Sequence, residues 1–109
     1  MFTDCPRLSD LYALYNWNVS KSTSFSGMFS YCLLLTNLKP LENWNVSNST
    51  NFSYMFYNCK SLSNISPLKN WNVSKPNNFS YIFYECQSLL SLKDLENWSL
   101  PKEVIKFMK

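Results

Sequence analysis

Four cysteines are the residues of this sequence whose chemistry could define a site, because they are evenly spaced. They lie at Cys5, Cys32, Cys59 and Cys86, always 27 residues apart. Such a set could form disulfides or bind zinc. However, one cysteine in each copy of a repeat gives parallel thiols roughly 5 Å apart. These lack the facing geometry of a disulfide and the tetrahedral arrangement of a zinc site. We interpret the thiols as a buried structural column and predict no metal site.

Asparagines form a second repeated pattern. The glycosylation signal Asn-x-Ser/Thr occurs at Asn18, Asn45, Asn48, Asn51, Asn64, Asn72, Asn78 and Asn97. In a secreted eukaryotic protein these residues would carry surface sugars. Alternatively, asparagine and serine side chains satisfy backbone groups in turns and form ladders between neighbouring copies. A repeated sequence repeats such signals automatically, so we favour the ladder interpretation.

No combination of residues predicts catalysis. The chain contains no His, its seven carboxylates do not pair at a fixed position, and it has no Gly-rich phosphate loop. These features predict a protein that is not an enzyme and binds no cofactor. The net charge of +3 is spread along the chain, which argues against a nucleic-acid partner. No apolar run is long enough for membrane insertion. Residues 1–5 do not resemble a secretory signal peptide, and the cellular location stays open.

The elements that would position these residues follow from the repeat itself. Tryptophans also recur every 27 residues, at Trp17, Trp44, Trp71 and Trp98, and leucine columns keep the same register. Residues 35–44 carry apolar side chains at every third position, which predicts a short strand entering a turn. Residues 52–59 carry them at i, i+3, i+4 and i+7, which predicts a two-turn helix. Thr50 or Asn51 would be its N-cap.

These patterns predict one domain of class α/β, a leucine-rich-repeat-type solenoid of about four 27-residue coils over residues 1–100. Each coil would consist of a short strand, a turn and a short helix. Residues 101–109 break the pattern, and Pro101 followed by Glu103 predicts a C-terminal capping helix. The sequence starts within a repeat, so its first coil is uncapped. That leaves open end-to-end self-association at the N-terminus, or a longer array.

Positions between the leucine columns vary from copy to copy and are expected to face solvent. They are Tyr12, Lys39, Ser66 and Lys93 at one station, and Tyr15, Glu42, Lys69 and Glu96 at a second. Varied side chains on a rigid face are how solenoids bind partners, so we predict these eight as binding residues. A further exposed stripe is aromatic and contains Tyr54, Tyr57, Tyr81 and Tyr84. Its composition suits contacts with protein or sugar.

Three motifs follow one another in the second copy: Asn-Trp-Asn-Val-Ser at 43–47, Thr-Asn-Phe-Ser-Tyr-Met-Phe at 50–56 and Asn-Cys-Lys-Ser-Leu at 58–62. Their order resembles the BspA-like leucine-rich-repeat surface proteins, also known as DUF285 repeats, over essentially the whole chain. The resemblance implies a non-enzymatic solenoid used for adhesion or host-protein binding. We therefore expect a non-catalytic scaffold that binds another macromolecule, foremost a protein. The alternatives are a module of a longer cell-surface adhesin that binds host protein or glycan, and a regulatory or spacer segment.

Overall fold

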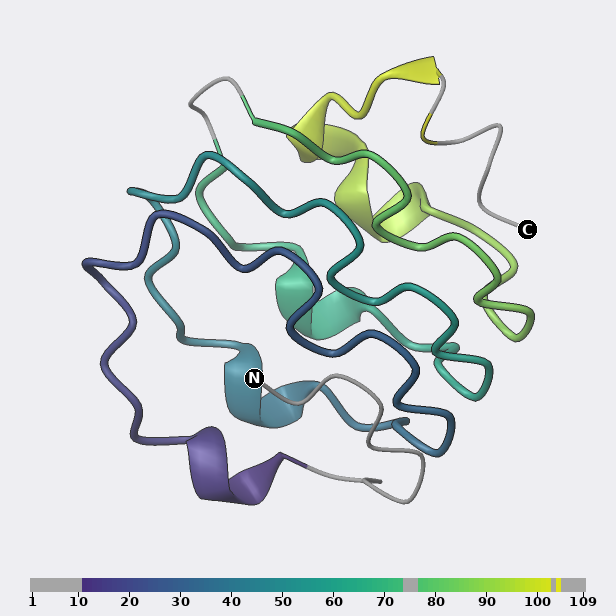
Figure 1. The fold of residues 1–109 in the computed structure, drawn as a ribbon, viewed down its shortest axis with the longest axis horizontal. Helices are drawn as coiled ribbons and strands as arrows, with labels where there is room; N and C mark the ends of the chain where they lie inside the picture. The colour runs from purple at the N-terminus through teal and green to yellow at the C-terminus, as the bar shows by residue number, and fades with distance from the viewer. Residues whose placement is uncertain (1–10, 74–76, 103, 105–109) are drawn as a thin grey trace.

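The computed structural model describes residues 11–73, 77–102 and 104. Its main regular elements are four 3-10 helices: η1 (Tyr12–Leu14), η2 (Lys39–Leu41), η3 (Ser66–Leu68) and η4 (Lys93–Trp98). Strand pairing within the described residues is limited to two isolated parallel bridges, Ser24 with Asn51 and Asn51 with Asn78. Figure 1 shows the helices behind a set of winding segments, with successive copies of the repeat side by side. None of the described helices has the length and apolar character that crossing a bilayer requires.

The predicted fold class is wrong. The α/β leucine-rich-repeat-type solenoid needed a strand and a two-turn helix in every coil, but the described residues contain neither a sheet nor a two-turn α-helix. Residues 52–59, the predicted helix, consist mainly of turns. Residues 35–44, the predicted strand, contain η2. The 27-residue period instead places irregular segments of equivalent sequence against one another.

The 3-10 helices explain the three-residue spacing of the buried leucines. A 3-10 helix has about three residues per turn, so side chains at i and i+3 lie on one line. Leu35, Leu38, Leu41 and Trp44 are all buried. The N–H groups of Leu41 and Trp44 donate to carbonyl oxygens three residues earlier, at 2.9 and 3.1 Å. Pro40 lies in the first turn of η2, where its missing N–H costs no helix hydrogen bond.

Residues 52–59 do not form a helix because their N–H groups alternate between two kinds of partner. The N–H of Phe56 donates to the carbonyl oxygen of Ile82 in the next copy at 2.9 Å. The N–H of Met55 instead turns back to Phe52 at 3.2 Å. An α-helix would need each of these groups to donate four residues back. Tyr54 also has a φ of 60°, which lies outside the right-handed helical region.

Aromatic columns fill the core between the 3-10 helices and the winding segments. Phe29 stacks on Phe56, and Phe56 on Phe83, with ring centroids 5.6 and 5.7 Å apart. Two further columns are formed by Phe25, Phe52 and Phe79 and by Trp44, Trp71 and Trp98. All of these rings are buried, and a stacked pair contributes about 0.5–1.5 kcal/mol beyond its buried area. Each copy of the repeat therefore depends on its neighbours for a closed core.

The predicted capping helix falls largely outside the described residues, which after Lys102 include only Val104. Both of these residues are helical. The N–H of Val104 donates to the carbonyl oxygen of Pro101 at 3.0 Å, and its side chain belongs to the buried core. A capping helix over the whole of residues 101–109 stays a prediction.

Candidate functional site

The 3-10 helices bring the two variable stations together on one side of the molecule. Tyr12, Lys39, Ser66 and Lys93 are the first residues of η1 to η4. Tyr15, Glu42 and Lys69 are the C-cap residues of η1 to η3, and Glu96 lies within η4. The leucine between the two stations is buried in every copy, whereas six of the eight station residues are exposed and Glu42 and Ser66 are partly exposed. These eight residues form one surface, which we call the variable face.

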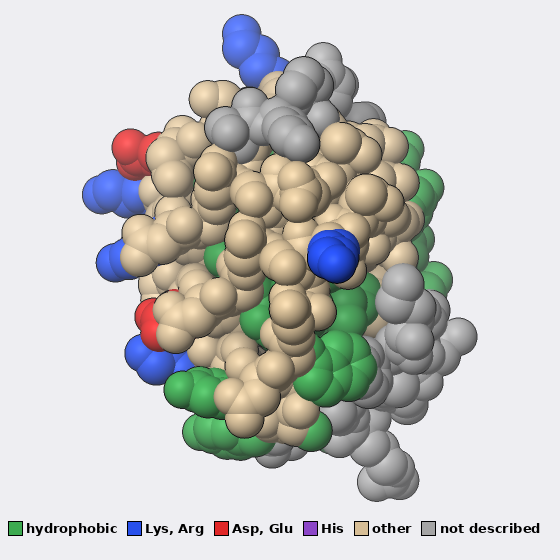
Figure 2. Space-filling view, turned by 90° about the vertical axis from the view of Figure 1, so that its left-hand side faces the viewer, with side chains coloured by type: hydrophobic (Ala, Val, Ile, Leu, Met, Phe, Trp, Pro, Cys, Tyr) green, Lys and Arg blue, Asp and Glu red, His purple; other side chains and the backbone are tan. Residues whose placement is uncertain are grey.

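The variable face combines opposite charges with two tyrosines. Lys39 Nζ lies 3.0 Å from Glu42 Oε1, an exposed ion pair of a kind that adds little to stability. Tyr12 and Tyr15, at the η1 end, are 64% and 62% exposed. Figure 2 shows that most acidic and basic side chains in view gather along one edge, beside a broad surface of uncharged groups. Tyrosine is enriched in protein–protein interfaces, whereas lysine and glutamate are depleted there, so the two tyrosines are the feature of this face that suits protein binding.

The asparagines of the glycosylation signals close turns and connect copies. Asn45 Oδ1 accepts hydrogen bonds from the N–H and the hydroxyl of Ser47 at 3.1 and 2.7 Å. Asn18 makes the same two bonds with Ser20. Asn48 Nδ2 reaches the preceding copy and donates to the carbonyl oxygen of Ser20 at 2.8 Å. The predicted turn bonds are therefore confirmed for Asn18 and Asn45, and the predicted link between copies is confirmed for Asn48.

The cysteines form a buried column. Cys32, Cys59 and Cys86 are buried and form no disulfide, whereas Cys5 lies outside the described residues. The thiol of Cys59 donates to the carbonyl oxygen of Phe29 at 3.1 Å, and Cys86 makes the equivalent bond one copy further on at 3.0 Å. Burial raises the pKa of both thiols, that of Cys86 to about 12.

Thiolates are the nucleophilic and metal-binding form of cysteine, so these protonated thiols act as structural donors at neutral pH. No group of three or more Cys, Asp or Glu side chains in the described part of the chain could hold a metal ion. The prediction of a structural column is confirmed for the three described cysteines.

A second surface, which the sequence identified only in part, consists of five tyrosines. We call Tyr31, Tyr54, Tyr57, Tyr81 and Tyr84 the tyrosine ladder. Tyr54 stacks on Tyr81 and Tyr57 on Tyr84, with centroids 5.2 and 5.7 Å apart. Edge-on contacts at 5.3–5.4 Å complete the network. Two effects raise the pKa of Tyr57 above its ordinary value: the larger is desolvation by burial, and the next is a side-chain hydrogen bond with Tyr31.

Three tyrosines of the ladder have a backbone conformation that glycine usually supplies. The φ angles of Tyr31, Tyr54 and Tyr81 are 63°, 60° and 58°, a region that costs an L-residue about 1–2 kcal/mol. Gly27 occupies the station equivalent to Tyr54 and Tyr81, with a φ of +67°. This single glycine is the sequence signal that could have revealed the conformation. Asn58 and Glu85, which are equivalent to Tyr31, have φ angles of 61° and 64°, so this conformation belongs to the station in the repeat and not to the tyrosine side chain.

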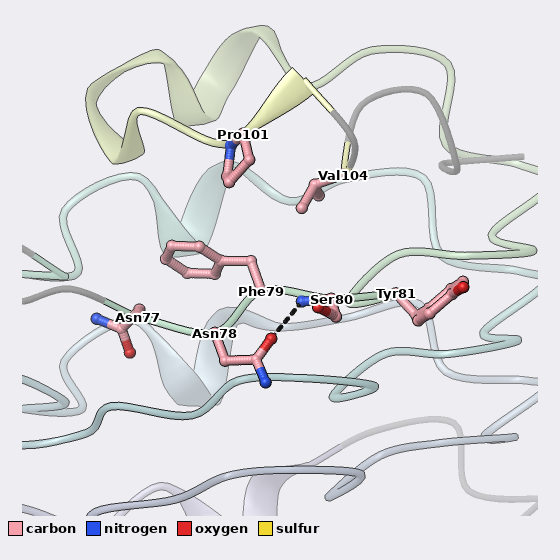
Figure 3. Close-up of a pocket in the computed structure, with 7 residues that line it drawn as sticks. All are labelled: Asn77, Asn78, Phe79, Ser80, Tyr81, Pro101 and Val104. Atoms are coloured by element: carbon pink, nitrogen blue, oxygen red, sulfur yellow. Dashed lines mark hydrogen bonds between the residues drawn. The ribbon is translucent and has the colours of Figure 1, made fainter.

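A cavity lies at the end of the last copy, between residues 77–81 and the side chains of Pro101 and Val104 (Figure 3). Its volume is about 300 Å³. In its wall, Asn78 Oδ1 accepts a hydrogen bond from the N–H of Ser80 at 2.9 Å. None of the described residues that line it is a carboxylate, a lysine or a cysteine, so it offers no acid–base or nucleophilic group of these types.

These features define a tandem-repeat protein with structural buried columns and exposed stations that differ between copies. Residues 1–108 match the family described as "Mycoplasma protein of unknown function, DUF285", and the chain belongs to this family. The DUF285 part of the predicted resemblance is thereby confirmed. No curated protein and no solved structure matches the chain significantly.

Proposed function

We propose that this chain is a non-catalytic scaffold that binds a protein through its variable face. The supporting observation is the position of eight side chains that differ between copies. They lie on one row of 3-10 helices whose buried leucines do not differ. A constant core with changing outward side chains can be adapted to a partner without altering the fold.

The η1 end of the variable face would supply most of the binding energy. Tyr12 and Tyr15 are its most exposed aromatic groups, and tyrosine is enriched among the residues that dominate protein interfaces. Lys39 and Lys69 would contribute to partner orientation and association rate more than to affinity. A hollow of about 300 Å³ beside Glu42, lined partly by asparagines of two copies, would receive a side chain of the partner.

The motif order also favours a protein partner. It resembles that of BspA-like surface proteins, a group often used for adhesion or host-protein binding. In that setting the chain would be one module of a longer adhesin, and the variable face would contact the host protein.

Site-specific photo-cross-linking tests the proposal. A benzophenone amino acid would replace Tyr15 or Lys69 on the variable face, or the exposed Ser63 outside it as a control, in protein expressed in its native cells. We expect a discrete covalent adduct from positions 15 and 69 and none from position 63. Equal adducts from all three positions, or none from any, would contradict a specific variable-face interaction. The second outcome would favour a spacer.

A charge-exchange variant separates binding from folding. Lys39→Glu combined with Glu42→Lys preserves the net charge and keeps opposite charges at the two positions of the ion pair, but it reverses the charge order that a partner meets. We expect unchanged thermal unfolding and a lower yield of the position-15 adduct. An unchanged yield would mean that charge on this face does not contribute to recognition.

A further inference from the structure

The hollow beside Glu42 has polar walls whose chemistry selects the group that can enter it. It lies between two copies of the repeat and is lined by residues 42–46 of one copy and by Asn70 and Asn72 of the next. Its volume is about 300 Å³, at the lower end of the range of about 300–1,000 Å³ for ligand sites. This volume suits one long side chain of a partner. We call this site the Glu42 hollow.

Glu42 gives the hollow its charge. Among the described residues that line the hollow, Glu42 is the only ionised one, and four others are asparagines. Glu42 Oε1 lies 3.0 Å from Lys39 Nζ, and the two side chains are 37% and 67% exposed. An exposed pair of this kind is weak, so a ligand can compete for the carboxylate. A positively charged group therefore complements the Glu42 hollow.

Two of the asparagines can bond to a ligand without losing an existing bond. Asn43 and Asn70 are exposed and occupy the same station in successive copies. Within the described residues, neither side chain makes a hydrogen bond. Asn97, at the same station of the next copy, instead donates Nδ2 to the carbonyl oxygen of Lys69 at 3.0 Å. The Glu42 hollow therefore offers two side-chain amide oxygens in addition to a carboxylate.

A guanidinium group suits these acceptors better than an ammonium group. Its five N–H groups form a planar fork that can bond a carboxylate and amide oxygens together, whereas an ammonium is a compact, strongly hydrated charge. Trp44 and Val46 also line the hollow and are buried, which gives it an apolar component. The methylene stem of an arginine can cover apolar surface while its head bonds polar groups.

The other copies show which of these groups is specific to the Glu42 hollow. The asparagine station is the same in all four copies, as Asn16, Asn43, Asn70 and Asn97. At the three junctions between described copies, the station beside it carries Tyr15, Glu42 and Lys69. Among these three junctions, a carboxylate is therefore present at the one after η2 alone. A cationic side chain would be recognised at this junction and would meet a like charge at Lys69.

We infer that the Glu42 hollow binds an arginine side chain of the protein partner. Glu42 accepts hydrogen bonds from the guanidinium, and the amide oxygens of Asn43 and Asn70 accept from its remaining N–H groups. Arginine is enriched in protein–protein interfaces. The inference rests on the proposed function, because it names the partner group that this part of the variable face recognises.

Nuclear magnetic resonance titration of the full chain with the end-blocked peptide Gly-Gly-Arg-Gly-Gly tests the inference. The side-chain amide signals of Asn43 and Asn70 report binding in the hollow. We expect saturable shifts with half-saturation at about 1–10 mM peptide. The same peptide with lysine or neutral citrulline in place of arginine should bind at least about threefold more weakly. The inference is overturned if no saturable shift occurs up to about 50 mM peptide, or if the lysine peptide binds equally well.

Glu42→Gln is the informative variant, because it removes the charge and keeps the size of the side chain. We expect it to weaken binding of the arginine peptide by about three- to fivefold and to leave thermal unfolding nearly unchanged, since the exposed ion pair contributes little to stability. Glu96→Gln is the matched control, because it removes the same charge from the same station outside the hollow. It should change the affinity by less than about twofold. Equal weakening by both variants would mean that net charge attracts the peptide, and the inference would be wrong.

The titration and the photo-cross-linking experiment fail independently. If the arginine peptide does not bind while positions 15 and 69 still give adducts, the inference is wrong and the proposed function stands. If the peptide binds in the hollow while neither position gives an adduct, the guanidinium site is supported and the proposed protein partner is not.

Discussion

The indoles of Trp71 and Trp98 offer a matched pair for measuring what one buried hydrogen bond contributes to this fold. They occupy the same station in successive copies, stack on each other with centroids 6.0 Å apart, and are only 2% and 3% exposed. Trp71 Nε1 donates to the carbonyl oxygen of Leu41 at 2.8 Å. Trp98 Nε1 is buried and has no hydrogen-bond partner in the described structure. This difference in hydrogen bonding between the two indoles coincides with the greater length of η4, which continues through Trp98 with a kink at Leu95.

Replacing each indole by phenylalanine removes the same volume, so the hydrogen bond accounts for most of the difference between the two variants. Trp71→Phe removes this hydrogen bond at a cost of about 0.5–1.5 kcal/mol, because the Leu41 carbonyl oxygen still accepts from the N–H of Trp44 at 3.1 Å. Trp98→Phe removes an unsatisfied buried donor and relieves a desolvation penalty of about 1–3 kcal/mol. We therefore expect Trp71→Phe to be less stable than Trp98→Phe by about 3 kcal/mol, or about 10 °C or more in Tm.

Urea unfolding followed by circular dichroism measures the difference directly. Trp44→Phe serves as a third variant, because Trp44 Nε1 donates to the carbonyl oxygen of Leu14 at 3.2 Å. Its cost should be closer to that of Trp71→Phe than to that of Trp98→Phe. Equal costs for Trp71→Phe and Trp98→Phe would refute the reasoning, because packing alone would then determine the stability of this column.

Three further predictions concern the backbone and the thiols. Glu85→Asn should stabilise the chain by about 0.5 kcal/mol, because asparagine tolerates positive φ better than glutamate. Asn58 occupies the equivalent position of the preceding copy with a φ of 61°, against 64° for Glu85. Thermal unfolding measures the effect, and a lower Tm would contradict the prediction. Gly27→Ala should destabilise it by about 1 kcal/mol. The added Cβ would lie at an ordinary 3.7 Å from its nearest heavy atom, so the positive φ and not a clash causes this cost. An unchanged midpoint of urea unfolding would contradict the prediction. Stability should fall as pH rises above 9, because the pKa of Cys86 is raised from 9.0 to about 12 and only the unfolded chain loses the proton in this window. Each such thiol lowers the free energy of unfolding by up to about 1.4 kcal/mol per pH unit. Cys86→Ala should therefore make the loss of stability between pH 9 and 10 less steep. If the wild-type chain and the variant lose stability with the same slope, the prediction is wrong.

The sequence predicted which residues form the core better than which elements carry them. Leu35, Leu38 and Leu41 are buried as their repetition indicated. However, a period of three fits a 3-10 helix as well as a strand that enters a turn. That choice is made by hydrogen bonds within a copy, such as the N–H of Leu41 to the Leu38 carbonyl oxygen. The failure of the predicted helix at 52–59 depends on bonds between copies, such as the N–H of Phe56 to the Ile82 carbonyl oxygen. No pattern within one copy reveals these bonds, because both partners are main-chain groups.

The candidate surfaces were predictable to different extents. The stations of Tyr12 and Tyr15 were identified by their variation, and the structure places both at the surface. That they bind a partner stays a prediction. Tyr31 was missed because its place in the ladder depends on an edge contact with Tyr57 in the following copy. The strain in the ladder was missed because a tyrosine in a sequence does not indicate a positive φ, whereas a glycine such as Gly27 can.

The ring contacts of Tyr54 offset the strain in its backbone. Its positive φ of 60° costs about 1–2 kcal/mol relative to glycine. Its stack on Tyr81, with centroids 5.2 Å apart, contributes about 0.5–1.5 kcal/mol. Its edge contact with Tyr57, with centroids 5.3 Å apart, adds a similar contribution, so the two ring contacts together offset the strain of the tyrosine.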